Sequence, residues 1–135
     1  MSDPEHARLL LEMAGKDFRA MRGMTDAEIF ADSIFSFHAQ QTVEKVLKAW
    51  CSWMGIAYPR THDIERLFQL LEESGVQVPE GFTSLTGLTD FAVQYRYEST
   101  DAGLGPVDRE EIIGSVRRFL THVATLVAAG GSDGR

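Results

Sequence analysis

Residues 37–50 concentrate amide and ammonium side chains at helical spacing. Gln41, Lys45 and Lys48 follow one another at intervals of four and three residues, so on a helix they project from one side. Gln40, Glu44 and Lys48 form an overlapping strip. The ammonium groups carry charge and the amides give directional hydrogen bonds, so the strip could hold an anion. The spacing alone favours a simpler alternative, a solvated helix face with Gln41–Lys45 and Glu44–Lys48 pairs.

His62 is a second residue that could contact an anion. It follows Arg60 and Thr61 at the predicted entry to a helix. Free N–H groups and the helix dipole favour an anion at such an entry. The alternative is that His62 or Thr61 caps the helix and fixes the preceding loop.

Arg96 lies between Tyr95 and Tyr97 at the predicted end of another helix. An arginine beside aromatic rings can hold a phosphate and stack a base, and Tyr97 is the candidate for stacking. Equally, Tyr95 could pack in the core while Arg96 pairs with Glu98 or with the helix C-terminus.

The sequence predicts no metal site and no bound cofactor. His6, His38, His62 and His122 fall on different predicted helices and have no metal-ligand spacing with Cys51, the single cysteine. His38 has apolar neighbours, which favours a hydrogen-bonded core or interface residue. No phosphate-binding loop, dinucleotide fingerprint or nucleophile elbow occurs.

Composition excludes several classes of protein. The chain has 135 residues, a net charge of −7 and 44% hydrophobic residues, which predicts one acidic globular domain. The acidic balance argues against duplex-DNA binding and against a basic membrane-surface protein. One cysteine excludes an internal disulfide and fits a cytoplasmic location. We find no secretion signal and no run of 18 apolar residues, so we expect no membrane-spanning segment.

Apolar periodicity and end signals predict an all-α, up-and-down bundle of about five helices without a sheet. The domain should cover residues 1–131, with a disordered tail at 132–135. The first helix should begin at Asp3-Pro4 and end at Gly23. The others should run over about 25–54, 61–74, 83–97 and 108–130. Thr25 and Glu28 form a capping-box pattern, with Met24 and Ile29 as its hydrophobic staple.

Several of these motifs together resemble the HEPN domain family. The likeness extends from about Ala7 to Val127. It rests mainly on the pattern Phe-x-x-Gln-Gln-x-x-Glu-Lys-x-x-Lys-Ala (37–49) and on Thr-His-Asp-Ile (61–64), with support from Tyr-Arg-Tyr (95–97) and from Ala14, Asp17 and Phe18. The resemblance implies a helical bundle, frequent homodimers, a nucleotide- or nucleic-acid-binding role, and often a small nucleotidyltransferase as partner.

Many members of that family are metal-independent RNases or toxins that carry Arg, four to six residues, then His. Arg96 is the matching arginine here, but Asp101, Ala102 and Gly103 stand where the histidine would be. A literal match, Arg117 to His122, falls inside the last predicted helix. Two residues five apart on a helix diverge by roughly 140°, so they should not face one phosphate. We therefore expect no catalytic residues, and whether the chain is an enzyme stays open.

The resulting expectation is a non-catalytic nucleotide- or nucleic-acid-binding module that contacts its ligand through Gln41, Lys45, Lys48, His62 and Arg96. It should be a homodimer, with Trp50 and Trp53 in the core or at the interface, and it could dock a nucleotidyltransferase. One alternative is a divergent RNase of a toxin–antitoxin system, and another is a purely structural or regulatory dimer. RNA is a possible partner with weak support.

Overall fold

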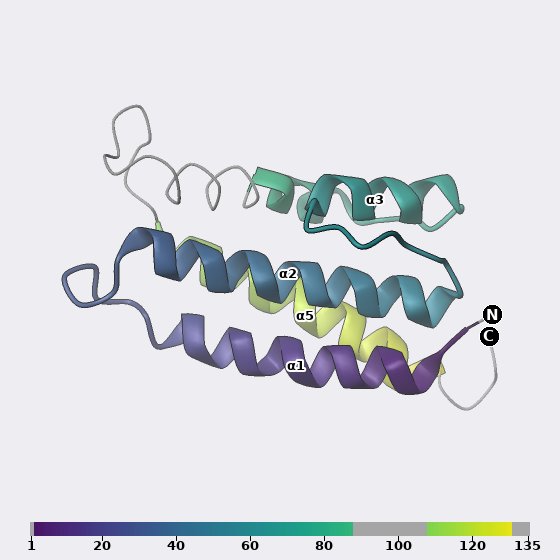
Figure 1. Ribbon diagram of the computed structural model, residues 1–135, viewed down its shortest axis with the longest axis horizontal. Helices are drawn as coiled ribbons and strands as arrows, with labels where there is room; N and C mark the ends of the chain where they lie inside the picture. Colours follow the sequence, from purple (N-terminus) through teal and green to yellow (C-terminus); the bar gives the residue numbers. More distant parts are fainter. Residues whose placement is uncertain (1, 88–107, 131–135) are drawn as a thin grey trace.

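The computed structural model describes residues 2–87 and 108–130 (Figure 1). Within these ranges it holds five helical elements and no strand: α1 (Pro4–Arg22), α2 (Asp32–Met54), α3 (Ile64–Glu73), the 3-10 helix η1 (Glu80–Thr86) and α5 (Arg109–Gly130). The predicted all-α bundle is therefore confirmed. The rest of the predicted fourth helix, with Arg96 and Tyr97, and the predicted tail 132–135 lie outside the described residues.

Short-range polar contacts fix three helix starts, two of which, at Asp3 and Asp108, have the cap that the sequence predicted, whereas α3 begins at Ile64, three residues after the predicted start. The Asp3 side chain accepts a hydrogen bond from the His6 N–H (3.1 Å), and Pro4 opens α1. The Asp63 side chain accepts from the N–H of Glu65 (3.0 Å) at the start of α3. At the start of α5, Asp108 accepts from the N–H of Glu111 (3.1 Å). These caps satisfy N–H groups that have no partner inside the helix.

The predicted start of the second helix is wrong, because α2 begins at Asp32 and the capping box at Thr25 does not form. The Asp26 side chain accepts from the N–H of Glu28 (2.9 Å) in a turn, and Ile29 is 70% exposed, so it forms no staple. The guanidinium of Arg109 donates to the backbone carbonyl of Phe30 (2.7 Å). A tertiary contact therefore holds this stretch outside the helix.

The core lies where α1, α2 and α5 meet. In Figure 1, α1 runs antiparallel to α2, and α5 passes behind both, so that α1 begins and α5 ends at the same end of the bundle. α2 contributes fully or nearly fully buried side chains along its whole length, including Phe35, Leu47 and Trp50. Trp53 is also buried, at 7% exposure. Both tryptophans therefore belong to the core of this chain, and neither supplies exposed apolar surface for a dimer.

The connection from α2 to α3 doubles back along α2 before α3 begins (Figure 1). Tyr58 lies beside Lys48, whose Nζ is 5.8 Å from the ring centroid, and His62 reaches Glu44 and Gln40 further back along the helix. This return path brings His62, one of the predicted site residues, alongside the strip of α2 formed by Gln40, Glu44 and Lys48.

α5 is the one helix within the described ranges that is long and apolar enough to cross a membrane by length and composition. The absence of an 18-residue apolar run had predicted no such segment. The apolar character of α5 has an explanation within the bundle, because one side of the helix is buried in the core. The residues on that side are Ile113, Val116, Phe119, Val123 and Val127.

Candidate functional site

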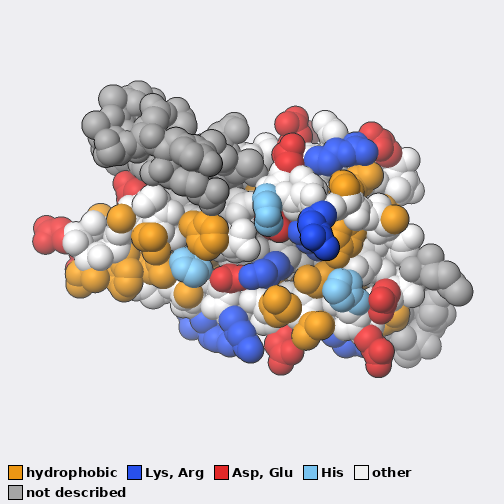
Figure 2. Space-filling model, in the orientation of Figure 1, with side chains coloured by type: hydrophobic (Ala, Val, Ile, Leu, Met, Phe, Trp, Pro, Cys, Tyr) orange, Lys and Arg blue, Asp and Glu red, His pale blue; other side chains and the backbone are white. Residues whose placement is uncertain are grey.

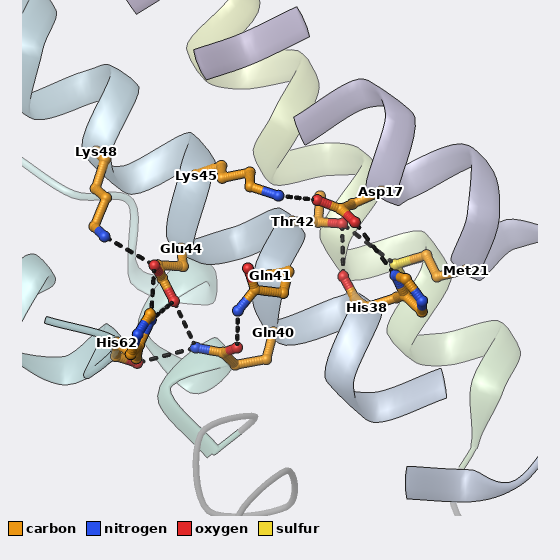
Figure 3. Close-up of polar contacts among 10 residues, drawn as sticks. All are labelled: Asp17, Met21, His38, Gln40, Gln41, Thr42, Glu44, Lys45, Lys48 and His62. Carbon is orange, nitrogen blue, oxygen red and sulfur yellow. Dashed lines mark hydrogen bonds and ion pairs between the residues drawn. The ribbon is translucent and has the colours of Figure 1, made fainter. Parts of the chain in front are cut away.

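The carboxylate of Glu44 on α2 gathers three side-chain partners (Figure 3). Its side chain is only 5% exposed. It accepts hydrogen bonds from Gln40 Nε2 (3.0 Å) and Lys48 Nζ (2.8 Å), and His62 Nδ1 lies 3.0 Å from its Oε1. We call Gln40, Gln41, Glu44, Lys48 and His62 the Glu44 network. A carboxylate with this little exposure requires such partners, because burial of an unpaired charge is costly.

Two different causes bring the members of the Glu44 network together. Gln40, Glu44 and Lys48 follow one another every four residues, so the helix alone places them on one face. His62 arrives from the returning connection, where its backbone carbonyl accepts a hydrogen bond from Gln40 Nε2 (2.9 Å). Gln40 therefore holds both the carboxylate and the loop that carries the histidine.

A second carboxylate, Asp17 on α1, organises the neighbouring part of α2 (Figure 3). Lys45 Nζ donates to its Oδ2, and His38 Nδ1 lies 3.2 Å from its Oδ1. The hydroxyl of Thr42 donates to the backbone carbonyl of His38 (2.8 Å). The prediction that His38 is a hydrogen-bonded core or interface residue is confirmed in its hydrogen bond to Asp17.

The predicted site residues thus divide into two groups. Lys48 and His62 meet on Glu44, whereas Lys45 turns to Asp17. Gln41 donates to Gln40 Oε1 (3.0 Å), so the predicted Gln41–Lys45 pair is wrong, while the Glu44–Lys48 pair forms.

Neither lysine of the strip is an unpaired cation. Lys45 and Lys48 each neutralise one carboxylate, and their side chains are 22% and 15% exposed. His62 differs, because its side chain is 79% exposed although it is held at Nδ1. In the view of Figure 2, the middle of this face accordingly mixes basic, acidic and histidine side chains instead of forming one basic patch. Positive and negative charges are paired on this surface. The contacts of any anion bound here would therefore depend on the positions of individual donors more than on net charge.

Sequence reasoning missed Asp17 as the partner of Lys45 and Glu44 as the centre of the site. Asp17 lies 28 residues before Lys45, so no helical spacing could reveal the pair. Glu44 stood in the strip, but its burial depends on the returning connection. Neither His62 nor Thr61 provides the side-chain cap of α3, since Asp63 is the residue that caps it.

The other histidines contact residues outside the Glu44 network: His6 contacts Tyr58, and His38 contacts Asp17. His122 packs its ring against Trp50 and Phe82, with ring centroids 5.5 and 5.3 Å apart. Arg117 instead stacks over Phe18 of α1, 5.5 Å from the ring centroid. The two residues of the literal RNase-like match therefore have different surroundings, as the helical geometry predicted. No group of three potential metal ligands occurs within residues 2–87 and 108–130.

Comparison with known proteins gives one match. The family model described as HEPN domain matches residues 7–126, which is most of the chain. No curated protein and no solved structure matches the sequence or the fold.

Proposed function

Because this chain belongs to the HEPN domain family, we propose that it is a non-catalytic module that binds a nucleotide through the surface around Glu44. Membership makes it a helical domain of a nucleotide- or RNA-binding family. The sequence supports a non-catalytic role. The RNases of the family have a histidine at a position where this chain has Asp101, Ala102 or Gly103.

The observation that carries the proposal is the convergence of Lys48 and His62 on Glu44. An ammonium group has three N–H donors, and Lys48 uses one of them on Glu44. The remaining donors can bind phosphate oxygens. Arg60 is exposed two residues before His62 and adds a guanidinium to the same connection. Donors from two elements thus surround a surface on which one side chain, His62, is both held in place and accessible.

The charge of the chain favours a small ligand over a long nucleic acid. RNA carries one negative charge per nucleotide, and binding along its backbone needs many free cations. This chain has a net charge of −7, and both strip lysines already neutralise carboxylates. A mononucleotide needs only the local contacts at Lys48, Arg60 and His62.

A thermal-shift titration with ATP, GTP, AMP and GMP tests the proposal. A ligand present at about 100 times its Kd should stabilise the fold by about 2.7 kcal/mol, which raises the Tm by several degrees. The replacement His62→Ala should weaken binding about fivefold and so reduce this shift by about one third. Its matched control is Arg66→Ala, because Arg66 is an exposed residue of α3 whose partners among the described residues, Glu73 and Gln69, lie on its own helix.

The absence of any shift at millimolar nucleotide would contradict the proposal. Incubation with structured and unstructured RNA tests the RNase alternative in the same preparation. If the wild type cleaves RNA and Arg96→Ala does not, the protein is an RNase and the proposal of a non-catalytic module is wrong.

The proposed assembly is a homodimer in the cytoplasm that docks a small nucleotidyltransferase supplied by another chain. Support for the dimer comes from exposed apolar residues where α2 begins, which are considered in the Discussion. If the polar strip served only as a seam between two copies, Lys45→Ala and Lys48→Ala would change association and leave nucleotide affinity unaltered.

A further inference from the structure

The contacts of His62 determine which of its ring nitrogens carries a proton. His62 Nδ1 lies 3.0 Å from Glu44 Oε1 and 3.2 Å from Oε2. The same carboxylate accepts from Lys48 Nζ at 2.8 Å, as an ionised group does. An ionised carboxylate can only accept hydrogen bonds, so Nδ1 must be the donor. In the neutral ring, the other nitrogen, Nε2, then carries a lone pair and no proton.

The side-chain amides of Gln40 and Gln41 also donate hydrogen bonds towards Glu44. Gln40 Nε2 spends its two N–H groups on Glu44 Oε1 (3.0 Å) and on the carbonyl of His62 (2.9 Å). Gln40 Oε1 accepts from Gln41 Nε2 (3.0 Å). The chain of hydrogen bonds therefore runs from Gln41 through Gln40 to Glu44, and it fixes both the backbone and the ring of His62.

The imidazole edge that carries Nε2 is left to solvent. The His62 side chain is 79% exposed, and its described side-chain contacts are made by Nδ1. Two cations lie near it on the chain, Lys48 on the Glu44 carboxylate and Arg60 two residues before His62, and both have donors and no acceptor. His62 Nε2 is thus a positioned acceptor beside two cationic side chains.

We infer that His62 Nε2 accepts a hydrogen bond from a hydroxyl or amino group of the bound ligand, and that Glu44 is the positioning residue that imposes this polarity. The inference rests on the proposed function. A nucleotide offers phosphate oxygens, which suit Lys48 and Arg60, and it offers ribose hydroxyls or an exocyclic amine, which suit Nε2. His62 would then select for a donor on the sugar or base, while the cations select for phosphate.

The tautomer can be measured without a ligand. Long-range 1H–15N NMR spectra at pH 8, where an ordinary imidazole is neutral, should show His62 with a protonated Nδ1 and an unprotonated Nε2. The replacement Glu44→Gln should raise the share of the opposite tautomer, because an amide can donate to Nδ1 as well as accept from it. A His62 ring protonated mainly at Nε2 in the wild type would overturn the inference. A tautomer unchanged by Glu44→Gln would remove the positioning role of Glu44.

The ligand contact is tested with AMP, 2′-deoxy-AMP, 3′-deoxy-AMP and IMP, measured by calorimetry at pH 8. One of the three analogues should bind about fivefold more weakly than AMP, which corresponds to the loss of one hydrogen bond. The analogue that is weakened identifies the donor as a ribose hydroxyl or as the exocyclic amine. In His62→Asn the amide can still donate to Glu44 but Nε2 is gone, so AMP should weaken about fivefold and the discrimination should disappear.

The results separate the two proposals. Failure of the wild type to bind AMP or the other nucleotides would remove the proposed function itself. Binding of AMP by the wild type with equal affinity for all analogues, or unchanged binding in His62→Asn, would overturn only the role of Nε2.

Discussion

At the scale of single residues, two carboxylates, the buried Glu44 and the half-buried Asp17, organise the polar face of α2. Glu44 and Asp17 expose 5% and 17% of their side chains, and each binds one lysine and one histidine. Removal of a partner from such a group leaves a charge that water reaches poorly, and this is more costly than the loss of an exposed ion pair. The lysines of the strip therefore stabilise the fold, whatever Lys48 contributes to the proposed ligand site.

Cys51 gives a prediction at the same scale. The side chain is fully buried, and burial raises the pKa of its thiol from 9.0 to about 11. Because the thiolate is the reactive form, this change lowers the reactive fraction at pH 8 about a hundredfold. We expect iodoacetamide, followed by mass spectrometry, to modify the folded protein at least about a hundredfold more slowly than the protein in urea.

The same thiol links stability to high pH. Above pH 9 the unfolded thiol ionises before the folded one, so the free energy of unfolding should decrease as the pH rises from 9 towards 11. The variant Cys51→Ala should lack this component of the pH dependence. Equal iodoacetamide rates in the folded and unfolded states would show that the thiol is accessible, contrary to its burial.

At the scale of helices, Arg109 determines how α1 connects to α2. It is 6% exposed, and it donates to the carbonyls of Met24 (2.8 Å) and Phe30 (2.7 Å) and to the Asp32 side chain (2.5 Å). Its guanidinium also lies 5.0 Å from the centroid of the Phe35 ring. A residue at the start of α5 thus holds the turn before α2 in place. The hydrogen bonds span 77 to 85 residues of sequence, so the local capping pattern at Thr25 could not reveal them.

We expect Arg109→Ala to lower the free energy of unfolding by about 3 kcal/mol, because two carbonyls and a carboxylate lose their common donor. Urea denaturation followed by circular dichroism measures this loss. Arg118→Ala is the matched control, since Arg118 is exposed and, within residues 2–87 and 108–130, its side chain bonds to Ser115 one turn earlier. Its effect should stay within about 0.5 kcal/mol. Equal losses of unfolding free energy in the two variants would contradict the role of Arg109 in holding the turn before α2 in place.

At the scale of the whole molecule, apolar side chains remain exposed where α2 begins. Ile29, Ile34 and Phe37 are 70%, 48% and 38% exposed, and Figure 2 shows hydrophobic side chains gathered over this end of the bundle. Clustered apolar surface of this kind marks interaction sites more often than isolated exposed residues do. Since Trp50 and Trp53 are buried, this surface replaces them as the basis of the proposed dimer.

Light scattering at tens of micromolar protein should therefore give the mass of a dimer. The replacement Phe37→Asp places a charge in the proposed contact and should shift the equilibrium towards monomer without loss of helical circular dichroism. Met54→Asp adds the same charge at the opposite end of α2, where Met54 is 48% exposed, and should leave the mass unchanged. If the wild type is a monomer, the proposed dimer is wrong. If both variants dissociate the dimer equally, the contact does not lie at the start of α2.

Features that depend on neighbours along the chain were predictable from the residues. Apolar periodicity predicted the helical class, Asp3 and Asp108 predicted two helix starts, and four-residue spacing predicted the Glu44–Lys48 pair. Each involves residues within about one turn of helix, where geometry is fixed by the backbone.

Only the tertiary structure decided the partner of Lys45, the attachment of His62 to Glu44 and the late start of α2. These contacts join residues 18 to 85 positions apart, so they depend on how whole helices and connections pack. A polar side chain in a helix can turn towards several neighbours. The buried carboxylate or carbonyl that packing brings within reach selects one of them, because leaving that group unpaired away from water is costly.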